Sequence, residues 1–195
     1  MKHIFLSLLF IGTLGITPLF ALQENEITAF MQKNIDNATA ILRDTKLQKN
    51  QKAEKIFSIF DTIFDYSLMA KLAVGGRYWE GLAPEKRKEF SHVFEQTLKT
   101  SYMEKLDLYT DEKLEIVKSE KIKDTRIHLT THLTKNKEVY EIIYKFYKDP
   151  SNNWLIYDVD VLGVSIIQTY RTQFADFLAK DSIAALIAKL KTKDI

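Results

Sequence analysis

The first candidate for chemistry in this 195-residue sequence is Ser165, which lies in the stretch GVSII at 163–167. A serine on a sharp strand-to-helix turn is the nucleophile of α/β-hydrolases, but that turn needs Gly-x-Ser-x-Gly and a histidine later in the chain. Here the second glycine is missing, and no histidine follows His132. We therefore predict that Ser165 caps the following helix, and that Gly163 permits a tight turn before it.

Histidines and aspartates give no better catalytic set. His128 and His132 lie on one predicted strand about 13 Å apart, too far to share a zinc ion. Asp158 and Asp160 lie about 7 Å apart, a spacing that inverting glycosidases use, but neighbours on one strand cannot flank a substrate. A charge pair with Arg171 or a lysine, or simple solvation, explains them better. The sequence also lacks cysteine and a glycine-rich phosphate loop, so we predict no catalytic residue, metal or cofactor.

The elements that would position these residues follow from hydrophobic spacing, which changes from a helical period to a period of two and back. The predicted helices cover 27–42, 51–64, 65–74, a long helix opening at 83–86, then 166–179 and 183–190. The predicted strands cover 114–118, 125–134, 139–148 and 154–162. Short polar links between the strands favour a meander. We expect an α+β fold with a four-stranded antiparallel sheet and several helices packed on one face.

Alternation along the last two predicted strands gives one face of the sheet an apolar surface. On the third strand this face carries Tyr140, Ile142, Tyr144 and Phe146. On the fourth strand the predicted apolar face carries Leu155, Tyr157, Val159 and Val161. Such a face either packs dry against the helices or forms the wall of an apolar cavity.

The N-terminus predicts export. Lys2 precedes an uncharged, mostly apolar run over 4–16, Pro18 breaks the run, and Ala21 offers a small residue for cleavage. A membrane anchor is the alternative, but the segment reaches only about 19 residues, which is marginal for a span. We expect a signal peptide at 1–21 and one mature domain at 22–195. A formal net charge of +2 is too small to indicate a nucleic-acid partner.

Two stretches, 64–102 and 153–178, resemble the MlaC family, also called toluene-tolerance auxiliary proteins. The matching motifs are Gly76, Tyr78 and Trp79; Pro84, Glu85 and Arg87; Trp154, Tyr157 and Asp158; Gly163, Val164 and Ser165; and Tyr170, Arg171 and Phe174. Each motif is weak alone, but their order and spacing over nearly the whole mature chain make the combination specific. The sequence departs from the family pattern at Gly75, where leucine is commoner, and at Ala83, where serine or threonine usually caps the helix.

The resemblance implies a monomeric periplasmic phospholipid carrier and no enzyme. Its partners would be an inner-membrane ABC transporter complex with an MCE-domain protein and an outer-membrane lipoprotein complex, in a system that maintains outer-membrane lipid asymmetry. The acyl chains would lie between sheet and helices with the headgroup in water, so we expect weak headgroup selectivity. The alternative is a lipid-free periplasmic adaptor or chaperone.

The resemblance and the apolar faces together predict fifteen lipid-contacting residues. From the sheet they are Tyr140, Ile142, Tyr144, Phe146, Tyr157, Val159 and Val161. From the helices they are Leu68, Met69, Leu72, Phe94, Leu98, Tyr102, Val164 and Ile167. Each of these residues could instead be ordinary core.

Overall fold

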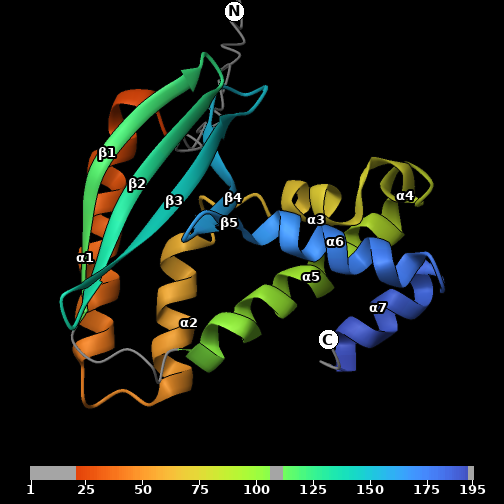
Figure 1. Cartoon of the computed structure of the whole chain (residues 1–195), viewed down its shortest axis with the longest axis horizontal. Helices are drawn as coiled ribbons and strands as arrows, with labels where there is room; N and C mark the ends of the chain where they lie inside the picture. The colour runs from red at the N-terminus through yellow and green to blue at the C-terminus, as the bar shows by residue number, and fades with distance from the viewer. Residues whose placement is uncertain (1–20, 106–111, 193–195) are drawn as a thin grey trace, which may run out of the picture.

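The computed structural model describes residues 21–105 and 112–192, an antiparallel sheet beside a group of helices (Figure 1). The helices are η1 (Glu24–Glu26), α1 (Ile27–Arg43), α2 (Lys49–Phe60), α3 (Tyr66–Val74), α4 (Gly76–Glu80), α5 (Pro84–Lys105), α6 (Ile166–Leu178) and α7 (Ile183–Thr192). The strands are β1 (Lys113–Lys123), β2 (Arg126–Lys135), β3 (Glu138–Lys148), β4 (Trp154–Val161) and β5 (Val164–Ser165). The predicted α+β class is confirmed. Within the two described ranges, no helix is both long and apolar enough to cross a bilayer.

The sheet is an antiparallel meander in the order β1-β2-β3-β4-β5. The meander is as predicted, but the sheet has five strands rather than four, because two residues after the last turn pair back onto β4. β1 is also longer than predicted. The predicted strand ends at residue 118, whereas β1 runs on to Lys123 through a lysine-rich stretch whose composition predicts a link. β1 is an edge strand, and charged side chains on an exposed edge prevent pairing with other chains.

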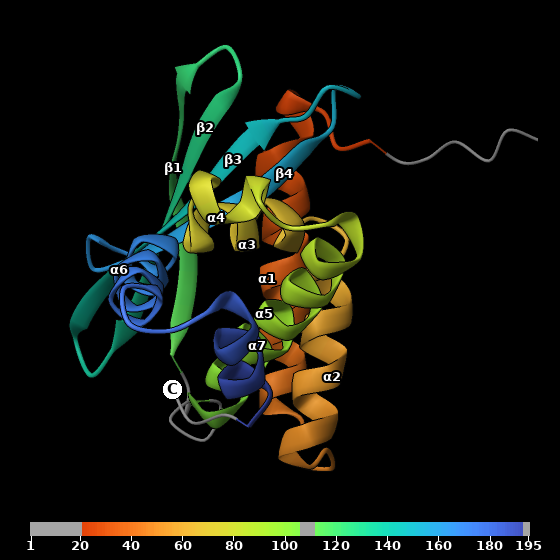
Figure 2. The same ribbon diagram turned by 90° about the vertical axis from the view of Figure 1, so that its right-hand side faces the viewer.

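One face of the sheet, called here the inner face, is apolar and covered by α1. Directly paired residues share a face: Ile127 lies opposite Phe146, and Leu129 lies opposite Tyr144. On the other side of β3, Val159 lies opposite Tyr144. Figures 1 and 2 show α1 running along this face of the sheet, with α2 beside α1. The inner face is therefore the surface that the predicted lipid site would need.

A β-bulge in β4 changes which of its residues point inward. Lys145 pairs with Asp158, but the next residue, Phe146, pairs with Ile156, so that Tyr157 is the extra residue. Ile156 has none of its surface exposed and packs on the inner face. An extra residue shifts the alternation of side chains by one position. The inward-facing residues before the bulge therefore do not continue the same every-second-residue pattern after it.

The bulge overturns the predicted apolar face of β4. Uninterrupted alternation places Leu155 and Tyr157 beside Val159, but Leu155 pairs with Tyr147, which belongs to the outer face. The ring of Tyr157 lies 6.0 Å from the ring of Tyr147. The guanidinium of Arg126 lies 5.2 Å from the Tyr157 ring. Tyr157 is therefore part of an aromatic and cationic group on the outer face.

Buried apolar side chains form two clusters. The sheet cluster consists of Leu22, Ile27, Met31, Ile63, Ile127, Leu129, Phe146, Trp154, Ile156 and Val159. The helical cluster consists of Met69, Ala70, Ala73, Val74, Trp79, Phe90, Val93, Phe94, Leu98, Ile167, Phe174, Leu178, Leu186, Ile187 and Leu190. The expectation that all helices pack on one face of the sheet is therefore wrong. Helices α3 to α7 pack mainly on one another, on the far side of β4 from β1 (Figure 1). Phe64 and Ile166 contact both clusters.

The turn between β4 and β5 has two successive residues in the left-handed region. Leu162 has φ 54° and Gly163 has φ 78°. Two positive φ angles are the mark of a type I′ hairpin turn, for which Asn-Gly is the preferred sequence. The predicted role of Gly163 in a tight turn is confirmed, but Leu162 is an unfavourable residue for its position, and 57% of its surface is exposed.

Replacing Leu162 with asparagine should stabilise the protein by about 1 kcal/mol, because asparagine tolerates the left-handed conformation better than leucine. For a domain of this size the melting temperature should rise by roughly 2–4 °C. Thermal unfolding followed by circular dichroism measures the change. Val164→Asn, on the adjacent strand, is the control and should give no rise. An unchanged or lower melting temperature for Leu162→Asn would contradict the assignment of strain to this turn.

Candidate functional site

Ser165 caps the N-terminus of α6. Its hydroxyl oxygen accepts a hydrogen bond from the backbone N–H of Gln168 at 2.9 Å, which confirms the predicted helix cap. The same hydroxyl donates to Asp158 Oδ2 at 2.8 Å. The Ser165 hydroxyl thus links the first turn of α6 to the Asp158 carboxylate and fixes where α6 begins.

Asp158 is the centre of the junction between β4, β5 and α6. It is buried, with 5% of its surface exposed. Besides the Ser165 hydroxyl, it accepts hydrogen bonds from the backbone N–H groups of Val159 at 2.9 Å and Ile167 at 3.2 Å. Lys145 Nζ lies 3.0 Å from its Oδ2. A buried carboxylate with this many donors ties three elements together, and the predicted pairing with a lysine is confirmed.

Lys145 forms ion pairs with both Asp158 and Asp160. Its Nζ also lies 2.6 Å from Asp160 Oδ1. Burial opposes the charged form, but hydrogen bonds to Asp160 and Asp158 outweigh it and raise the pKa of Lys145. One cation with two carboxylates leaves the group with a formal charge of −1. In the part of the chain that the structure describes, no group of three histidine, aspartate or glutamate side chains could hold a metal ion.

Three tyrosines from three elements meet between the two apolar clusters. Tyr144 lies on the inner face of β3 and packs against the sheet cluster. Tyr170 of α6 packs its ring against Phe94, with centroids 5.1 Å apart, and its hydroxyl lies 3.4 Å from Ser101 Oγ. Tyr102 of α5 is close enough to both other tyrosines for them to raise its pKa, although burial is the largest cause.

Tyr102 and Tyr144 keep accessible surface, but both have a raised pKa. Of the Tyr102 surface, 44% is exposed, and Tyr144 is half-buried. Burial nevertheless raises the pKa of Tyr102, and it raises the pKa of Tyr144 to about 12. Both rings therefore keep accessible surface next to protein atoms that disfavour the ionised phenolate.

Tyr144 should ionise only near pH 12, whereas an ordinary tyrosine ionises near pH 10. Because its pKa is higher in the folded than in the unfolded chain, its contribution to stability is complete below pH 10. That contribution is lost as the pH rises through 12, and it is on the order of 3 kcal/mol. Tyrosinate absorbance, titrated in the natural protein and in Tyr144→Phe, measures this. The difference between the two curves should rise near pH 12, and a rise near pH 10 would contradict the enclosure of Tyr144.

The fifteen residues predicted to contact lipid occupy three settings. Closed core holds Met69, Phe94, Leu98, Phe146, Val159 and Ile167. Half-buried positions hold Leu68, Leu72, Tyr140, Ile142, Tyr144 and Tyr157. Exposed positions hold Tyr102, Val161 and Val164. The structure brings Tyr140, Ile142 and Tyr144 together on one face of β3, but it places Tyr157 on the outer face and Leu68 and Leu72 on α3.

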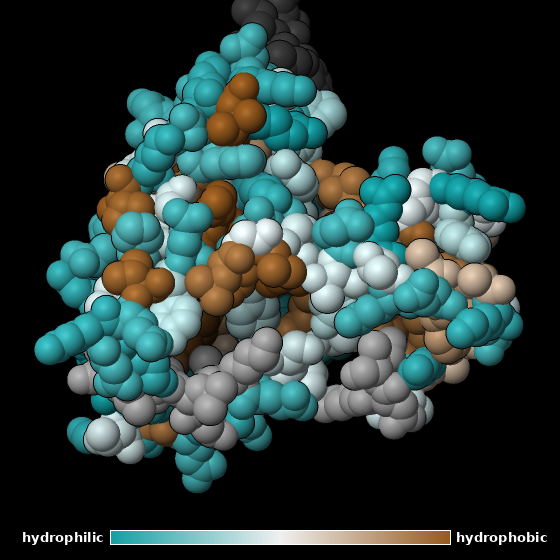
Figure 3. Space-filling model, viewed as in Figure 1, coloured by the Kyte–Doolittle hydropathy of each residue, from teal (hydrophilic) through white to brown (hydrophobic). Residues whose placement is uncertain are grey.

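The inner face becomes progressively more exposed toward the β4–β5 hairpin. Val159 is 3% exposed, Val161 is 37% exposed and Val164, its partner on β5, is 60% exposed. Leu162, at the tip, adds a further exposed apolar side chain. Figure 3 shows apolar side chains gathered over this hairpin in the middle of the view. Apolar side chains therefore extend from the buried part of the inner face to the exposed hairpin.

The inner face also involves α1 and β1, which the predicted site leaves out. Phe30 of α1 and Ile116 of β1 are half-buried and pack against the sheet cluster. The spacing of apolar residues over 27–42 was the available signal, because an amphipathic helix must bury its apolar stripe against some surface.

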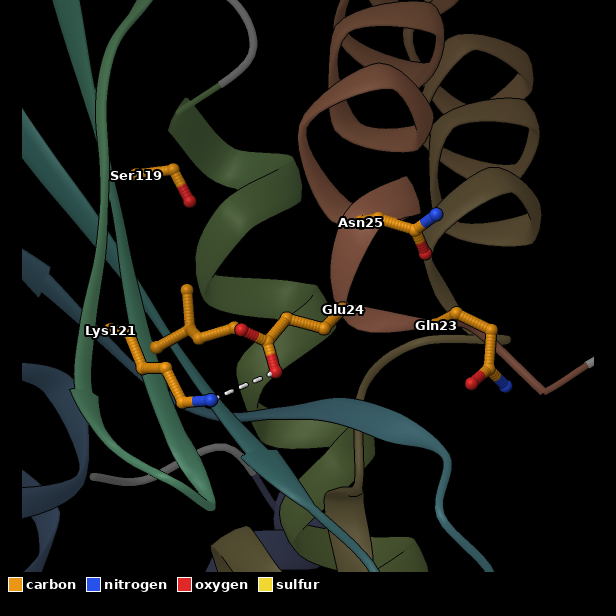
Figure 4. Close-up of a pocket in the computed structure, with 6 residues that line it drawn as sticks. Gln23, Glu24, Asn25, Ser119 and Lys121 are labelled. Atoms are coloured by element: carbon orange, nitrogen blue, oxygen red, sulfur yellow. Dashed lines mark hydrogen bonds and ion pairs between the residues drawn. The ribbon is translucent and has the colours of Figure 1, made fainter.

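Two open grooves lie where the N-terminal helices meet the sheet, one beside η1 and the other between α1 and β1. One, of about 440 Å³, is lined by Gln23, Glu24, Asn25, Ser119, Lys121 and Ile127. Figure 4 shows Lys121 reaching across it to Glu24, with Nζ 3.3 Å from Oε2. The other, of about 550 Å³, is lined by Gln32, Asp36, Thr39, Arg43, Lys113, Leu114, Glu115 and Ile116. Both are mostly polar, and neither is lined by any of the fifteen predicted residues.

Comparisons with known proteins agree with one another. A family model described as MlaC protein matches residues 32–192. A Haemophilus influenzae protein named intermembrane phospholipid transport system binding protein MlaC is 23% identical, and the match covers 98% of this chain and 92% of that protein. A Ralstonia solanacearum phospholipid-binding protein, solved in complex with a phospholipid, has a similar fold with a TM-score of 0.72 and 23% identity. That match covers 85% of this chain and 94% of the other.

Proposed function

Since the chain belongs to the MlaC family, we propose that it is a phospholipid carrier that holds acyl chains between the inner face of its sheet and its helices. The names of the two relatives support cargo of this kind. The observation that carries the proposal for this chain is the apolar inner face of the sheet, whose exposure rises from 3% at Val159 to 37% at Val161 and 60% at Val164.

Exposure also decides which residues are proposed to line the lipid site. A lining residue must keep some accessible surface, so closed core residues such as Phe94 and Phe146 support the wall from behind. The residues proposed to touch cargo are Phe30, Tyr102, Ile116, Tyr140, Ile142 and Tyr144. The graded exposure from Val159 to Val164 supports an entrance at the β4–β5 hairpin. This leaves the headgroup near water and favours weak headgroup selection.

The energetics of an exposed lipid explain why a carrier is needed. Burying one methylene group contributes about 0.8 kcal/mol, so exposing roughly 30 methylenes costs on the order of 25 kcal/mol. Free diffusion of a two-chain lipid through water is negligible against such a barrier. An apolar interior replaces the hydrocarbon of the membrane almost evenly, so transfer in and out can be nearly neutral in free energy.

The proposed setting is the periplasm, with residues 1–21 removed on export and 22–195 forming one mature domain. Leu22 supports this boundary, since it is 2% exposed and its backbone N–H donates to Asn153 Oδ1 at 2.7 Å. The Trp154 N–H donates to the Leu22 carbonyl at 3.1 Å. The proposed partners are an inner-membrane MCE-type ABC transporter complex and an outer-membrane lipoprotein complex, between which the protein shuttles as a monomer.

Mass spectrometry of the gently purified mature protein tests the proposal. We expect about one phospholipid per chain, with headgroups in roughly the proportions of the host membrane. A protein free of lipid would indicate an adaptor or chaperone instead. Strong enrichment of one headgroup would contradict the open position proposed for the polar end of the lipid.

A further inference from the structure

The β4–β5 hairpin ends in an exposed apolar tip. Val161, Leu162 and Val164 expose 37%, 57% and 60% of their surface. The sequence carries no charged side chain from Val161 to Tyr170, so the tip and the start of α6 behind it are uncharged. An exposed group of aliphatic side chains without charge favours hydrocarbon over water.

The backbone of the tip is hydrogen-bonded within the protein. Val161 pairs with Val164 on the neighbouring strand. The Leu162 N–H donates to the Glu141 carbonyl at 2.9 Å. Hydrocarbon offers no partner to backbone groups, so a segment that enters the apolar part of a bilayer must pair its backbone internally. A hairpin with aliphatic side chains meets this condition.

Leu162 keeps the tip apolar at a conformational cost. Its φ of 54° lies in the left-handed region, which asparagine tolerates better than leucine. The turn itself needs no leucine, because Asn-Gly would form it more readily. With more than half of its surface exposed, the side chain gains little from packing. An apolar residue kept at such a position indicates a role outside the folded chain.

The size and composition of the tip favour a lipid surface over a protein partner. A stable protein interface buries about 1,000 Å² or more and is anchored by aromatic residues or arginine. The tip offers three aliphatic side chains, which is too small a surface for such an interface. Its surroundings do not attract anions, because Glu141 is exposed beside it and Lys145 is shared between Asp158 and Asp160. Attraction to a membrane must therefore come from apolar contact.

We propose that the β4–β5 hairpin inserts shallowly into the lipid bilayer when the protein collects or delivers its cargo. The inference rests on the proposed carrier function and adds the surface that meets the membrane. Val161 pairs with Ile142 on the inner face, so an acyl chain that leaves the bilayer at the tip meets apolar side chains rather than water. Three partly exposed side chains give weak, reversible attachment, which suits a carrier that must leave again.

Tryptophan fluorescence of the mature protein tests insertion directly. Leu162→Trp places a ring at the tip, whereas the natural Trp79 and Trp154 are buried. On phosphatidylcholine vesicles with brominated acyl chains, the emission of Leu162→Trp should shift to shorter wavelength and be quenched. High salt should reverse neither change, because the attraction is not electrostatic. Ile122→Trp is the control and should show neither change, since Ile122 is 44% exposed but lies on β1, at the opposite edge of the sheet.

Lipid uptake tests the consequence of insertion. Delipidated mature protein is mixed with protein-free phosphatidylcholine vesicles, and lipid per chain is followed over time by mass spectrometry. Leu162→Asn should take up lipid about tenfold more slowly than the natural protein, because loss of one exposed leucine weakens partition into the bilayer by about that factor. The same substitution is expected to stabilise the fold, so slower uptake would not result from unfolding.

The two measurements separate the inference from the carrier function. Absence of quenching in Leu162→Trp on protein-free vesicles would overturn the inference, and a response seen only on host membranes would assign the hairpin to a protein partner instead. Uptake by Leu162→Asn at the natural rate would also overturn it and leave the carrier function standing. Quenching without lipid uptake by the natural protein would support insertion and overturn the carrier function.

Discussion

Replacing Ile142 with tryptophan should leave the protein folded but remove its phospholipid. Ile142 is half-buried on the inner face, between Thr131 and Val161, where we propose that the acyl chains lie. The larger ring would occupy the space proposed for the cargo. Every step of about 1.4 kcal/mol of interference lowers the binding constant tenfold, and a ring that fills the site should cost several such steps, so lipid per chain should fall at least about tenfold. Quantitative mass spectrometry of the purified variant measures this, and circular dichroism checks the fold.

The neighbouring residue provides a matched control. Ile143 is also a half-buried isoleucine on β3, but it lies opposite Thr130 and Asp160 on the outer face. Ile143→Trp adds the same ring to the same strand and should retain about one lipid per chain. Equal lipid content in the two variants would show that the cargo does not lie on the inner face.

Replacing Asp158 with alanine should destabilise the protein by about 3 kcal/mol, because removal of one partner leaves buried donors unpaired. Lys145 would keep Asp160, so the loss is placed at the lower end of the range for a broken buried pair. The Ile167 N–H and the Ser165 hydroxyl would both lose their acceptor, and the start of α6 would loosen. Chemical denaturation gives the free energy of unfolding.

An exposed carboxylate on the same helix is the control for this change. Asp176 lies on α6 and is exposed, so Asp176→Ala should alter the free energy of unfolding by no more than about 0.5 kcal/mol. If Asp158→Ala were as mild, the junction between β4, β5 and α6 would depend on packing alone rather than on its buried carboxylate.

The sequence predicts most elements because their signals are local. Helical spacing locates α1 and α5, Gly75 ends α3 with φ 85°, and polar turns separate the strands of the meander. The bulge at Tyr157 is not a local signal. The residues around it alternate regularly, and only the pairing with Phe146 shows that one residue is extra. The long β1 is hidden for a different reason, since an exposed edge strand has the composition of a loop.

For the candidate site too, the sequence predicts what depends on local spacing and misses what depends on tertiary contacts. Alternation identifies Ile142 and Tyr144 as neighbours on one face, and the structure agrees. It cannot separate Tyr144, which keeps accessible surface, from Phe146, which keeps none, because burial depends on what packs above the sheet. The contribution of α1 is missed for the same reason. Asp158 is singled out for its spacing to Asp160, whereas its role depends on contacts with residues seven and nine positions later.

The division of the core into two clusters has a consequence for the empty protein. Each cluster closes around its own buried side chains, and Phe64 and Ile166 link them. Departure of a lipid would uncover the border between the clusters but leave both interiors intact. The unloaded chain should therefore persist as a native molecule with slow amide exchange in α3 to α7, so that it can return for another load without refolding.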